Sequence, residues 1–429
     1  MDTIFALASA SGKAGVSIVR ISGDRALEAC AALGAKLMPH DRRLVSLRTD
    51  EGTLIDQAFA ISFAPGRSFT GEQVVELQTH GSPAVVSAVL NWLGNYGLRP
   101  AEAGEFTRRA MDNGELDLAQ VEGLADLIDA ETEGQRRQAV RVFGGALGDL
   151  ASGWREKLLR AAALLEATID FVDEEVPVDV YPEVRDLVGI VATEVTHEAS
   201  GVRVRERLRD GFEVALVGPP NSGKSTLLNR LAGRDAAITS DIAGTTRDVL
   251  EVRMDLDGLP VTVLDTAGLR ESSDVLEEIG IARGQARAAQ ADVRVHLVET
   301  EPDGHSKMID GFDVHVMSKG DTRTEDSVLL AVSGTTGKGV DTLLRVISDH
   351  LHDKVSAAGV ATRSRHETAL RRSMASLSTV MVGLGNDSTH VDLLAEDLRL
   401  AIRALDSLIG RVDVENVLGE IFSSFCIGK

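Results

Sequence analysis

The residues best suited to chemistry lie in one glycine-rich segment, residues 218–226, which reads GPPNSGKST. Its spacing fits the pattern G-x-x-x-x-G-K-[ST]. The glycines let the backbone curl so that consecutive N–H groups point at phosphate oxygens, and a following helix adds the positive end of its dipole. We expect Lys224 to reach the β- and γ-phosphates of a nucleotide and the Ser225 hydroxyl to ligate Mg²⁺. The alternative is a glycine-rich turn that binds nothing.

The flanking residues supply the elements that this loop needs. An apolar run at residues 212–217 predicts a strand before it, and residues 227–231 predict a helix after it, closed by Gly233. From residue 211 to residue 355 strand and helix patterns alternate, which is typical of a doubly wound parallel sheet. The order of strand, loop and helix favours the nucleotide site over the turn.

Two further motifs narrow the class of nucleotide site. A predicted strand at residues 261–264 ends in Asp-Thr-Ala-Gly at 265–268, where the Asp holds Mg²⁺ through water and the Gly N–H contacts the γ-phosphate. Between the two motifs lies Gly-Thr-Thr-Arg-Asp at 244–248. A threonine there completes the Mg²⁺ shell only while the γ-phosphate is present, so this loop is expected to act as a switch.

Later segments indicate recognition of a guanine base. They are Ser-Lys-Gly-Asp at 318–321, after a predicted strand at 314–317, and Ser-Gly at 333–334, after one at 328–332. Lys319 and Asp321 keep the usual pattern Asn-Lys-x-Asp, but Ser318 replaces the asparagine. We expect guanine because the Asp discriminates, with binding weakened by about 1 kcal/mol through the lost hydrogen bond.

The hydrolysis mechanism differs from that of Ras-like enzymes, which place a water-orienting Gln after this Asp-x-x-Gly segment. The chain has Leu269 there, and an apolar side chain cannot orient water. Either hydrolysis is nearly absent or a nearby carboxylate substitutes. The candidates are Glu271, Asp274, Glu277 and Glu278. No arginine finger is evident, so another cation must stabilise the transition state.

The amino-acid composition limits which further functions the chain can have. The net charge is −21 over 429 residues, which argues against non-specific wrapping of nucleic acid. Aromatic residues make up 3%, no apolar run approaches a membrane span, and the only cysteines are Cys30 and Cys426. We therefore expect a cytoplasmic protein without a secretory signal or membrane segment. Two arginine clusters are either nucleic-acid patches or helix faces balanced by acids: Arg203, Arg205, Arg207 and Arg209, and Arg136, Arg137 and Arg141.

The predicted fold class is multidomain, with an α+β N-terminal domain, a discontinuous all-α helical domain and an inserted α/β P-loop G domain. The mixed pattern of strands and helices ends near residue 118, where long helical periodicity begins. Helical periodicity returns after the α/β segment. The expected divisions are 1–118, 119–210 for the first helical part, 211–358 for the G domain and 359–429 for the second helical part. The two helical parts should pack together because neither buries its apolar stripe alone.

Several strings in fixed order make the chain resemble the MnmE (TrmE) family of tRNA-modification GTPases along nearly its whole length. They are SIVRISG at 17–23, SFTGEQVVELQTHG at 68–81, GEFTRRA at 104–110, LDLAQVEGLADLI at 116–128, DIAGTTRD at 241–248, DTAGLRE at 265–271 and FCIGK at 425–429.

The resemblance implies GTP, Mg²⁺ and K⁺ as cofactors of the G domain. Ser225 and Thr246 match the Mg²⁺ ligands, while K⁺ replaces the missing arginine, with matching positions at Asn221, Ser240, Ile242 and Thr245. Glu277 matches the residue that orients water, so the expected catalytic residues are Glu277, Thr246 and Lys224. The whole expected GTP-binding set is Asn221, Ser222, Gly223, Lys224, Ser225, Thr226, Ser240, Asp241, Ile242, Ala243, Gly244, Thr245, Thr246, Asp265, Thr266, Ala267, Gly268, Lys319, Asp321, Ser333 and Gly334.

The resemblance also implies an N-terminal domain that dimerises and binds a tetrahydrofolate derivative, either 5-formyl- or 5,10-methylene-tetrahydrofolate. Arg20, Glu76 and Lys429 match folate positions, whereas a third basic position falls on Glu115. On residues alone, Arg20 and Glu76 are also explained as a buried cross-strand pair. Cys426 is either a nucleophile in the modification chemistry or a small apolar filler.

The implied function is a K⁺-dependent GTPase that acts with a flavoprotein partner, MnmG (GidA), in a heterotetramer. Together they install an aminomethyl or carboxymethylaminomethyl group on C5 of the tRNA wobble uridine, and FAD is bound only by the partner. The alternative is a regulatory GTPase associated with RNA or ribosomes, which shares every G motif but requires a basic RNA-binding module. A third reading is a nucleotide-binding scaffold without turnover.

Overall fold

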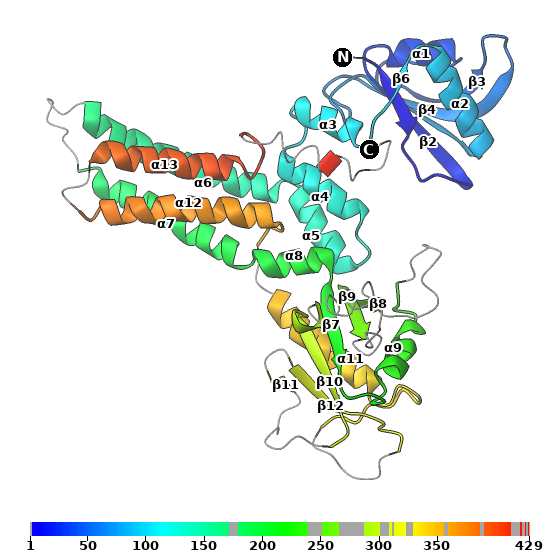
Figure 1. Ribbon diagram of the computed structural model, residues 1–429. Coiled ribbons are helices and arrows are strands. Elements are labelled where there is room, and N and C mark those ends of the chain that lie inside the picture. Colours follow the sequence, from blue (N-terminus) through cyan, green and yellow to red (C-terminus); the bar gives the residue numbers. More distant parts are fainter. Residues whose placement is uncertain are drawn as a thin grey trace, which may run out of the picture. The chain divides into compact units, whose positions relative to one another are not determined.

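The computed structural model forms two compact units, one of residues 1–125, 147–155 and 405–429 and the other of residues 126–146 and 156–404 (Figure 1). The residues that it describes are 2–170, 179–238, 251–265, 287–300, 309–310, 313–322, 329–355, 359–386, 390–412, 421–422, 425 and 428. The chain is thus multidomain, as expected.

A six-stranded sheet organises the first unit, in the order β3-β4-β5-β2-β1-β6. Its strands are β1 (Ile4–Leu7), β2 (Ala14–Ser22), β3 (Arg42–Arg48), β4 (Leu54–Phe63), β5 (Val74–Gly81) and β6 (Arg99–Pro100). All neighbours are antiparallel except β1 and β6, which are parallel. The sequence at residues 16–21 and 74–78 predicts strands, and both predictions are confirmed within β2 and β5.

One face of this sheet is covered by α1 (Ala26–Ala32) and α2 (Pro83–Asn95), whereas on the other face Phe106, in the helix Glu105–Asp112, packs against Ile4 and Ala6 of β1. Alternate residues of the strands form a core with α1 and α2, which includes Val45, Ala58 and Leu77. On the other face Leu44 of β3 and Phe59 of β4 are cross-strand partners, and they are 68% and 39% exposed. The α1 helix is shorter than the expected helix at 25–37, because the chain turns at Leu33 and Gly34 to meet β3.

The first unit continues into shorter helices and the end of the chain. They are α3 (Glu105–Asp112) and α4 (Leu118–Ile128), whose last residues belong to the second unit. Phe422 and Phe425 of the C-terminal segment pack with Val121 of α4. The end of the chain is therefore anchored to this unit.

The second unit consists of a helical part and a part built on a sheet. Long helices make up the helical part. They are α5 (Glu133–Phe143), α6 (Ala146–Asp170, which begins in the first unit), α7 (Tyr181–Ser200), α8 (Val202–Asp210), α12 (Ser364–Gly383) and α13 (Val391–Asp406). The α12 helix packs along α7 (Figure 1). A single helix over residues 182–208 was expected, but it is interrupted at Gly201. A methyl carbon there would lie 2.4 Å from the Arg205 guanidinium, which is buried against Glu198.

A second six-stranded sheet, in the order β11-β12-β10-β7-β9-β8, carries the glycine-rich loop. Its strands are β7 (Phe212–Val217), β8 (Glu251–Leu256), β9 (Leu259–Asp265), β10 (Val293–Val298), β11 (Ile309–Asp310) and β12 (Asp313–Met317), and its helices include α9 (Lys224–Ala232) and α11 (Val340–Val355). The four central strands are parallel, but β8 and β11 run antiparallel at the edges. The central strands thus form the parallel sheet expected from the alternation of strands and helices, and β8 and β11 add antiparallel edges to it.

One strand expected in this sheet is not found among the described residues. Of residues 328–332, the described part makes only an isolated bridge, between Ala331 and Met317. Within the described segments, no helix is long and apolar enough to span a bilayer.

Candidate functional site

The glycine-rich loop lies between β7 and α9, as its sequence predicts. Gly223 has φ +94° and Asn221 has φ +63°, so the backbone turns through left-handed conformations that let its N–H groups converge. At Gly218 a side chain is excluded, because a methyl carbon would lie 2.6 Å from the carbonyl oxygen of Leu297. The loop is therefore fixed against β10 at its start and by α9 at its end.

Lys224 is the first residue of α9 and is 4% exposed. Its Nζ donates to the carbonyl oxygens of Gly218 at 2.8 Å and Pro219 at 2.9 Å, so the ammonium lies inside the loop. Burial lowers the pKa of Lys224, opposed by the charge of Asp265. The ammonium is thereby held where the phosphates of a nucleotide would be bound.

Ser225 and Asp265 meet although forty residues separate them in the sequence. The Ser225 hydroxyl donates to Asp265 Oδ2 at 2.6 Å, and Asp265 is 6% exposed at the end of β9. Hydroxyl and carboxylate oxygens are hard donors of the kind that Mg²⁺ takes, usually together with waters and phosphate oxygens. This donor set fits the magnesium ion expected here.

The two segments expected to bind the base also lie together. Gly320 N donates to Val332 O at 3.0 Å, and Lys338 Nζ donates to Gly320 O at 3.0 Å. The pKa of Asp321 is lowered, chiefly by a hydrogen bond from the Ser333 side chain. Asp321 is thus kept as an ionised acceptor for the base.

Gly334 stands at a position where G domains usually have the alanine of a Ser-Ala pair, and the packing explains the glycine. A methyl carbon at this position would lie 2.6 Å from the backbone nitrogen of Leu227 in α9. The base loop therefore approaches the helix of the phosphate loop more closely than an alanine permits. Lys319, in turn, has φ +56° and pairs with Glu299 at 2.7 Å, a partner that the sequence pattern did not identify.

The switch residues lie outside the described residues. These are Ser240, Asp241, Ile242, Ala243, Gly244, Thr245, Thr246, Thr266, Ala267, Gly268 and Glu277. Of the expected K⁺ ligands only Asn221 is described, and it is exposed at the tip of the loop. Lys429 and Cys426 also lie outside the described residues.

Arg20 and Glu76 are directly opposite each other on β2 and β5. Arg20 Nε lies 2.9 Å from Glu76 Oε1, and the two side chains are 20% and 17% exposed. The guanidinium lies over the rings of Phe69, at 5.4 Å, and Phe106, at 5.6 Å from the ring centroid. Arg20 and Glu76 therefore form a cross-strand ion pair. The Arg20 guanidinium also lies over two aromatic rings that were not predicted from the sequence.

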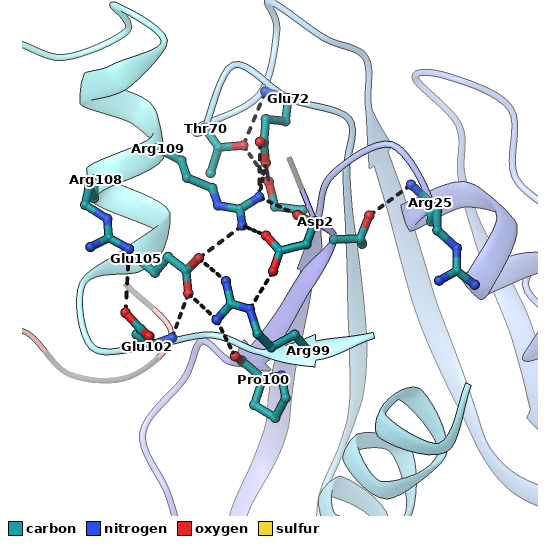
Figure 2. Close-up of polar contacts among 12 residues, drawn as sticks. Asp2, Arg25, Thr70, Glu72, Arg99, Pro100, Glu102, Glu105, Arg108 and Arg109 are labelled. Atoms are coloured by element: carbon teal, nitrogen blue, oxygen red, sulfur yellow. Dashed lines mark hydrogen bonds and ion pairs between the residues drawn. The ribbon is translucent and has the colours of Figure 1, made fainter. Parts of the chain in front are cut away.

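A network of charged side chains centred on the buried Arg109 lies next to these two aromatic residues in the sequence, and Figure 2 shows its polar contacts. Arg109, whose side chain is 5% exposed, donates to Asp2, to Glu72 at 3.1 Å and to Glu105 at 3.0 Å. Arg99 pairs with Asp2 and Glu105 as well. Glu72 lies in the loop of Phe69, and Glu105 precedes Phe106 in α3, so the network joins the two segments that carry these rings.

The carboxylates of this network are kept ionised. Hydrogen bonds from Arg99 and Arg109 outweigh burial and lower the pKa of Asp2 to about 2. Burial alone would raise the pKa of Glu105, but hydrogen bonds from Arg99 and Arg109 reverse the shift and lower it. The sequence indicates this network only through Arg108 and Arg109 in the string GEFTRRA. Two of the partners of Arg109, Asp2 and Glu72, lie far from it in the sequence.

The end of the chain approaches the same strands. A methyl carbon at Gly428 would lie 2.0 Å from the carbonyl oxygen of Leu7, the last residue of β1. Since Leu7 pairs with Val19 and Ala6 pairs with Arg20, the chain end lies beside the strand pair that carries Arg20. Glu115 is exposed, and its Oε1 would lie 3.1 Å from a methyl carbon at Gly71, in the same loop as Phe69.

The arginine clusters are largely neutralised by acids of their own unit. Their ion pairs are Arg136 and Arg137 with Glu133, Arg203 with Glu367, Arg205 with Glu198, Arg207 with Asp292, and Arg209 with Glu206 and Asp210. Arg141 donates to the carbonyl oxygen of Gly359 at 3.3 Å. The reading as balanced helix faces is favoured over nucleic-acid patches.

The loop between β7 and α9, the buried Lys224 and the Ser225–Asp265 pair define the part of the second unit that holds the second sheet as a P-loop nucleotide-binding domain. The family model described as "GTP-binding protein TrmE N-terminus" matches residues 3–115, and the one described as "MnmE helical domain" matches residues 118–426. Curated proteins called "tRNA modification GTPase MnmE" are 56% identical in Ruegeria pomeroyi and 57% identical in Cereibacter sphaeroides, over 100% of both chains in each case. The chain belongs to the MnmE (TrmE) family of tRNA modification GTPases. It is accordingly a GTP hydrolase that takes part in tRNA modification.

Among solved structures, the chain is similar to the FeoB G-domain from Methanococcus jannaschii. The identity is 24%, the match covers 33% of this chain and 98% of that one, and the TM-score is 0.24.

Proposed function

We propose that the chain is a K⁺-dependent GTPase that works with a flavoprotein partner on the tRNA wobble uridine. The partners install an aminomethyl or carboxymethylaminomethyl group on C5, with the one-carbon unit drawn from a tetrahydrofolate derivative. The observation that carries the proposal is that one chain of this family combines the Ser225–Asp265 pair with the Arg20–Glu76 pair beside the chain end.

In the proposed GTP site, each residue has a separate task. Lys224 holds the β- and γ-phosphates, and Ser225 and Thr246 hold Mg²⁺, which neutralises developing charge on the phosphates. Asn221, with Ser240, Ile242 and Thr245, holds K⁺, which supplies the positive charge that an arginine supplies elsewhere. Glu277 orients the attacking water, since Leu269 cannot. Support comes from the buried, inward-facing Lys224 and from the position of Asn221 at the loop tip.

The proposed folate site consists of Arg20, Glu76 and Lys429. Both members of the ion pair retain solvent exposure, and the partly buried Phe69, packed beside the fully buried Phe106, offers apolar surface to a flat ring system. Cys426 precedes Gly428 by two residues in the sequence, and its thiol would serve either in the chemistry or in packing of the chain end.

The proposed assembly is a homodimer through the N-terminal domain, joined by an MnmG (GidA)-type flavoprotein that binds FAD, in a heterotetramer that acts on tRNA in the cytoplasm. Exposure of Leu44 and Phe59 at the β3–β4 end of the first sheet, on the face opposite α1 and α2, supports the dimer. The proposed domains are residues 1–118, 119–210, 211–358 and 359–429. The two family models meet between residues 115 and 118, which supports the first boundary.

The test is nucleoside analysis of tRNA from cells that lack the gene and carry either the wild-type chain or a variant. We expect gene loss to remove the C5 group of the wobble uridine, and the wild-type chain to restore it. Glu76→Gln should fail to restore it although the purified variant still hydrolyses GTP. Unchanged wobble uridines together with a ribosome-subunit defect would contradict the proposal and favour the assembly GTPase.

A further inference from the structure

The β8–β9 hairpin connects the two switch segments of the GTP site. The β8 strand begins directly after residues 239–250, and β9 ends at Asp265, which accepts the Ser225 hydroxyl. At the far end of the hairpin Asp257 and Gly258 have φ of +52° and +88°, as in a two-residue type I′ turn. Gly258 N also donates to Asp255 Oδ1 at 2.6 Å. The hairpin is thus a short, well-fixed ribbon with the nucleotide site at one end.

The turn of this hairpin is bound to the N-terminus of α5, outside the nucleotide-binding sheet. Gly134 N donates to Gly258 O at 2.9 Å. Gly134 lies in the first helical turn, whose N–H groups lack partners within the helix, and Thr132 with Gln135 forms a capping box there. A methyl carbon at Gly134 would lie 2.5 Å from Gly258 O, so the contact requires glycine.

Two further contacts fix the turn. Ser348 of α11, which is 2% exposed, donates to Asp257 Oδ2 at 2.8 Å. Leu208 of α8 belongs to the same hydrophobic cluster as Leu256 and Leu259, the residues on either side of the turn. The turn therefore joins the core of the nucleotide-binding sheet to two helices of the helical part.

Space flanks this junction on both sides. One cavity of about 510 Å³ is lined by Gln135, Arg209 and Arg253, among others. A second cavity of about 580 Å³ is lined by Arg137, Arg141 and His352, among others. The contact between the turn and α5 is therefore bordered by space, and a displacement of Gly258 O would act directly on the Gly134 N–H that it accepts from.

We infer that Gly134 and Ser348 are positioning residues that transmit the nucleotide state of the GTP site to the helical part through the β8–β9 turn. A rearrangement of the switch segments acts on the near ends of β8 and β9, and the paired strands carry it to Asp257 and Gly258. The inference rests on the GTPase activity and on no assumption about K⁺ or folate.

The test uses hydrogen exchange of the full-length chain with GDP and with a non-hydrolysable GTP analogue. We expect the amides of residues 133–137 to exchange at rates that differ at least about threefold between the two nucleotides. Gly134→Ala should abolish this difference. Alanine is the better helix former, so the loss would not come from a weaker α5. The matched control is Gly189→Ala in α7, where no atom lies within 4 Å of the added carbon, and it should keep the difference.

Ser348→Ala is a second variant that leaves α5 unchanged, and it should reduce the same difference. Both variants should bind GTP within about twofold of the wild-type affinity, because neither residue touches the nucleotide loop. Equal exchange of residues 133–137 in the two nucleotide states of the wild type would overturn the inference. So would a nucleotide-dependent difference that persists in Gly134→Ala, or a loss of GTP affinity of more than about tenfold in both variants.

Discussion

Glu105 shows how individual residues of the first unit are held by partners that sequence spacing does not reveal. Its carboxylate is 3% exposed and pairs with Arg99 and Arg109. Arg109 lies one helical turn later, so that pair was accessible to sequence reasoning. The contacts of both arginines with Asp2 bridge about a hundred residues, and only the folded chain reveals them.

A substitution at Glu105 tests this network. Glu105→Gln should lower the free energy of unfolding of the first unit by about 2 kcal/mol at pH 7, because the buried Arg109 and the 40% exposed Arg99 lose a charged partner. Since folding lowers the pKa of Glu105, its stabilisation is present above the unfolded value of about 4.3 and is lost as the pH falls through the lowered value. The difference between wild type and variant should therefore shrink below about pH 4.

The measurement is urea unfolding followed by tryptophan fluorescence. It reports on the first unit because both tryptophans, Trp92 and Trp154, lie in it. Glu102→Gln is the control, since the Glu102 side chain is 69% exposed and makes only a 3.6 Å contact with Arg108. An equal loss of stability for Glu105→Gln at pH 7 and pH 3 would contradict the account.

At the scale of elements, local patterns predicted the existence of helices and strands better than their ends. The strand–loop–helix around Lys224 follows from glycine spacing and apolar runs, and it is found as expected. The interruption at Gly201 does not follow from periodicity, because it depends on a buried Arg205 that also donates to Ala361 O at 2.7 Å. The described part of the strand predicted at 328–332 bonds only to the end of β12 and the loop after it: Met317 N donates to Leu330 O, Val332 N to Met317 O and Gly320 N to Val332 O.

The C-terminal segment is the element whose position matters most for the proposed folate site. Gly428→Val should displace the chain end from β1, because the added carbon meets the Leu7 carbonyl and φ is +104°. We expect wobble-uridine modification to fall by at least about tenfold while the rate of GTP hydrolysis stays within about twofold. Nucleoside analysis of tRNA and a phosphate-release assay measure the two quantities.

The matched control for the C-terminal segment is Gly15→Val. Gly15 lies in β2, in the same unit, and no atom lies within 4 Å of an added carbon there. This variant should retain both activities. Normal modification by Gly428→Val would show that the position of the chain end is not needed for the reaction.

At the scale of the whole molecule, the order of motifs along the chain indicated the family, and the family comparisons confirm it. The second six-stranded sheet was predicted from the alternation of strands and helices. The two segments expected to bind the base, at 318–321 and 333–334, were predicted from their motifs and from the strands before them. The arginine clusters were ambiguous from sequence, because some of their acidic partners, Glu198, Asp292 and Glu367, lie on other elements. With those clusters neutralised and a net charge of −21, we expect tRNA to be held mainly by a more basic partner.

The central claim is that a monovalent cation at Asn221 completes the GTP site of this chain. The most direct measurement is the rate of GTP hydrolysis as K⁺ replaces Na⁺ at constant ionic strength, for the wild type and for Asn221→Ala. The account predicts a rate at least about tenfold higher in K⁺ for the wild type, because a transition-state cation contributes a large factor, and a lost response in the variant. Equal wild-type rates in Na⁺ and K⁺, or an unaltered K⁺ response in Asn221→Ala, would contradict it.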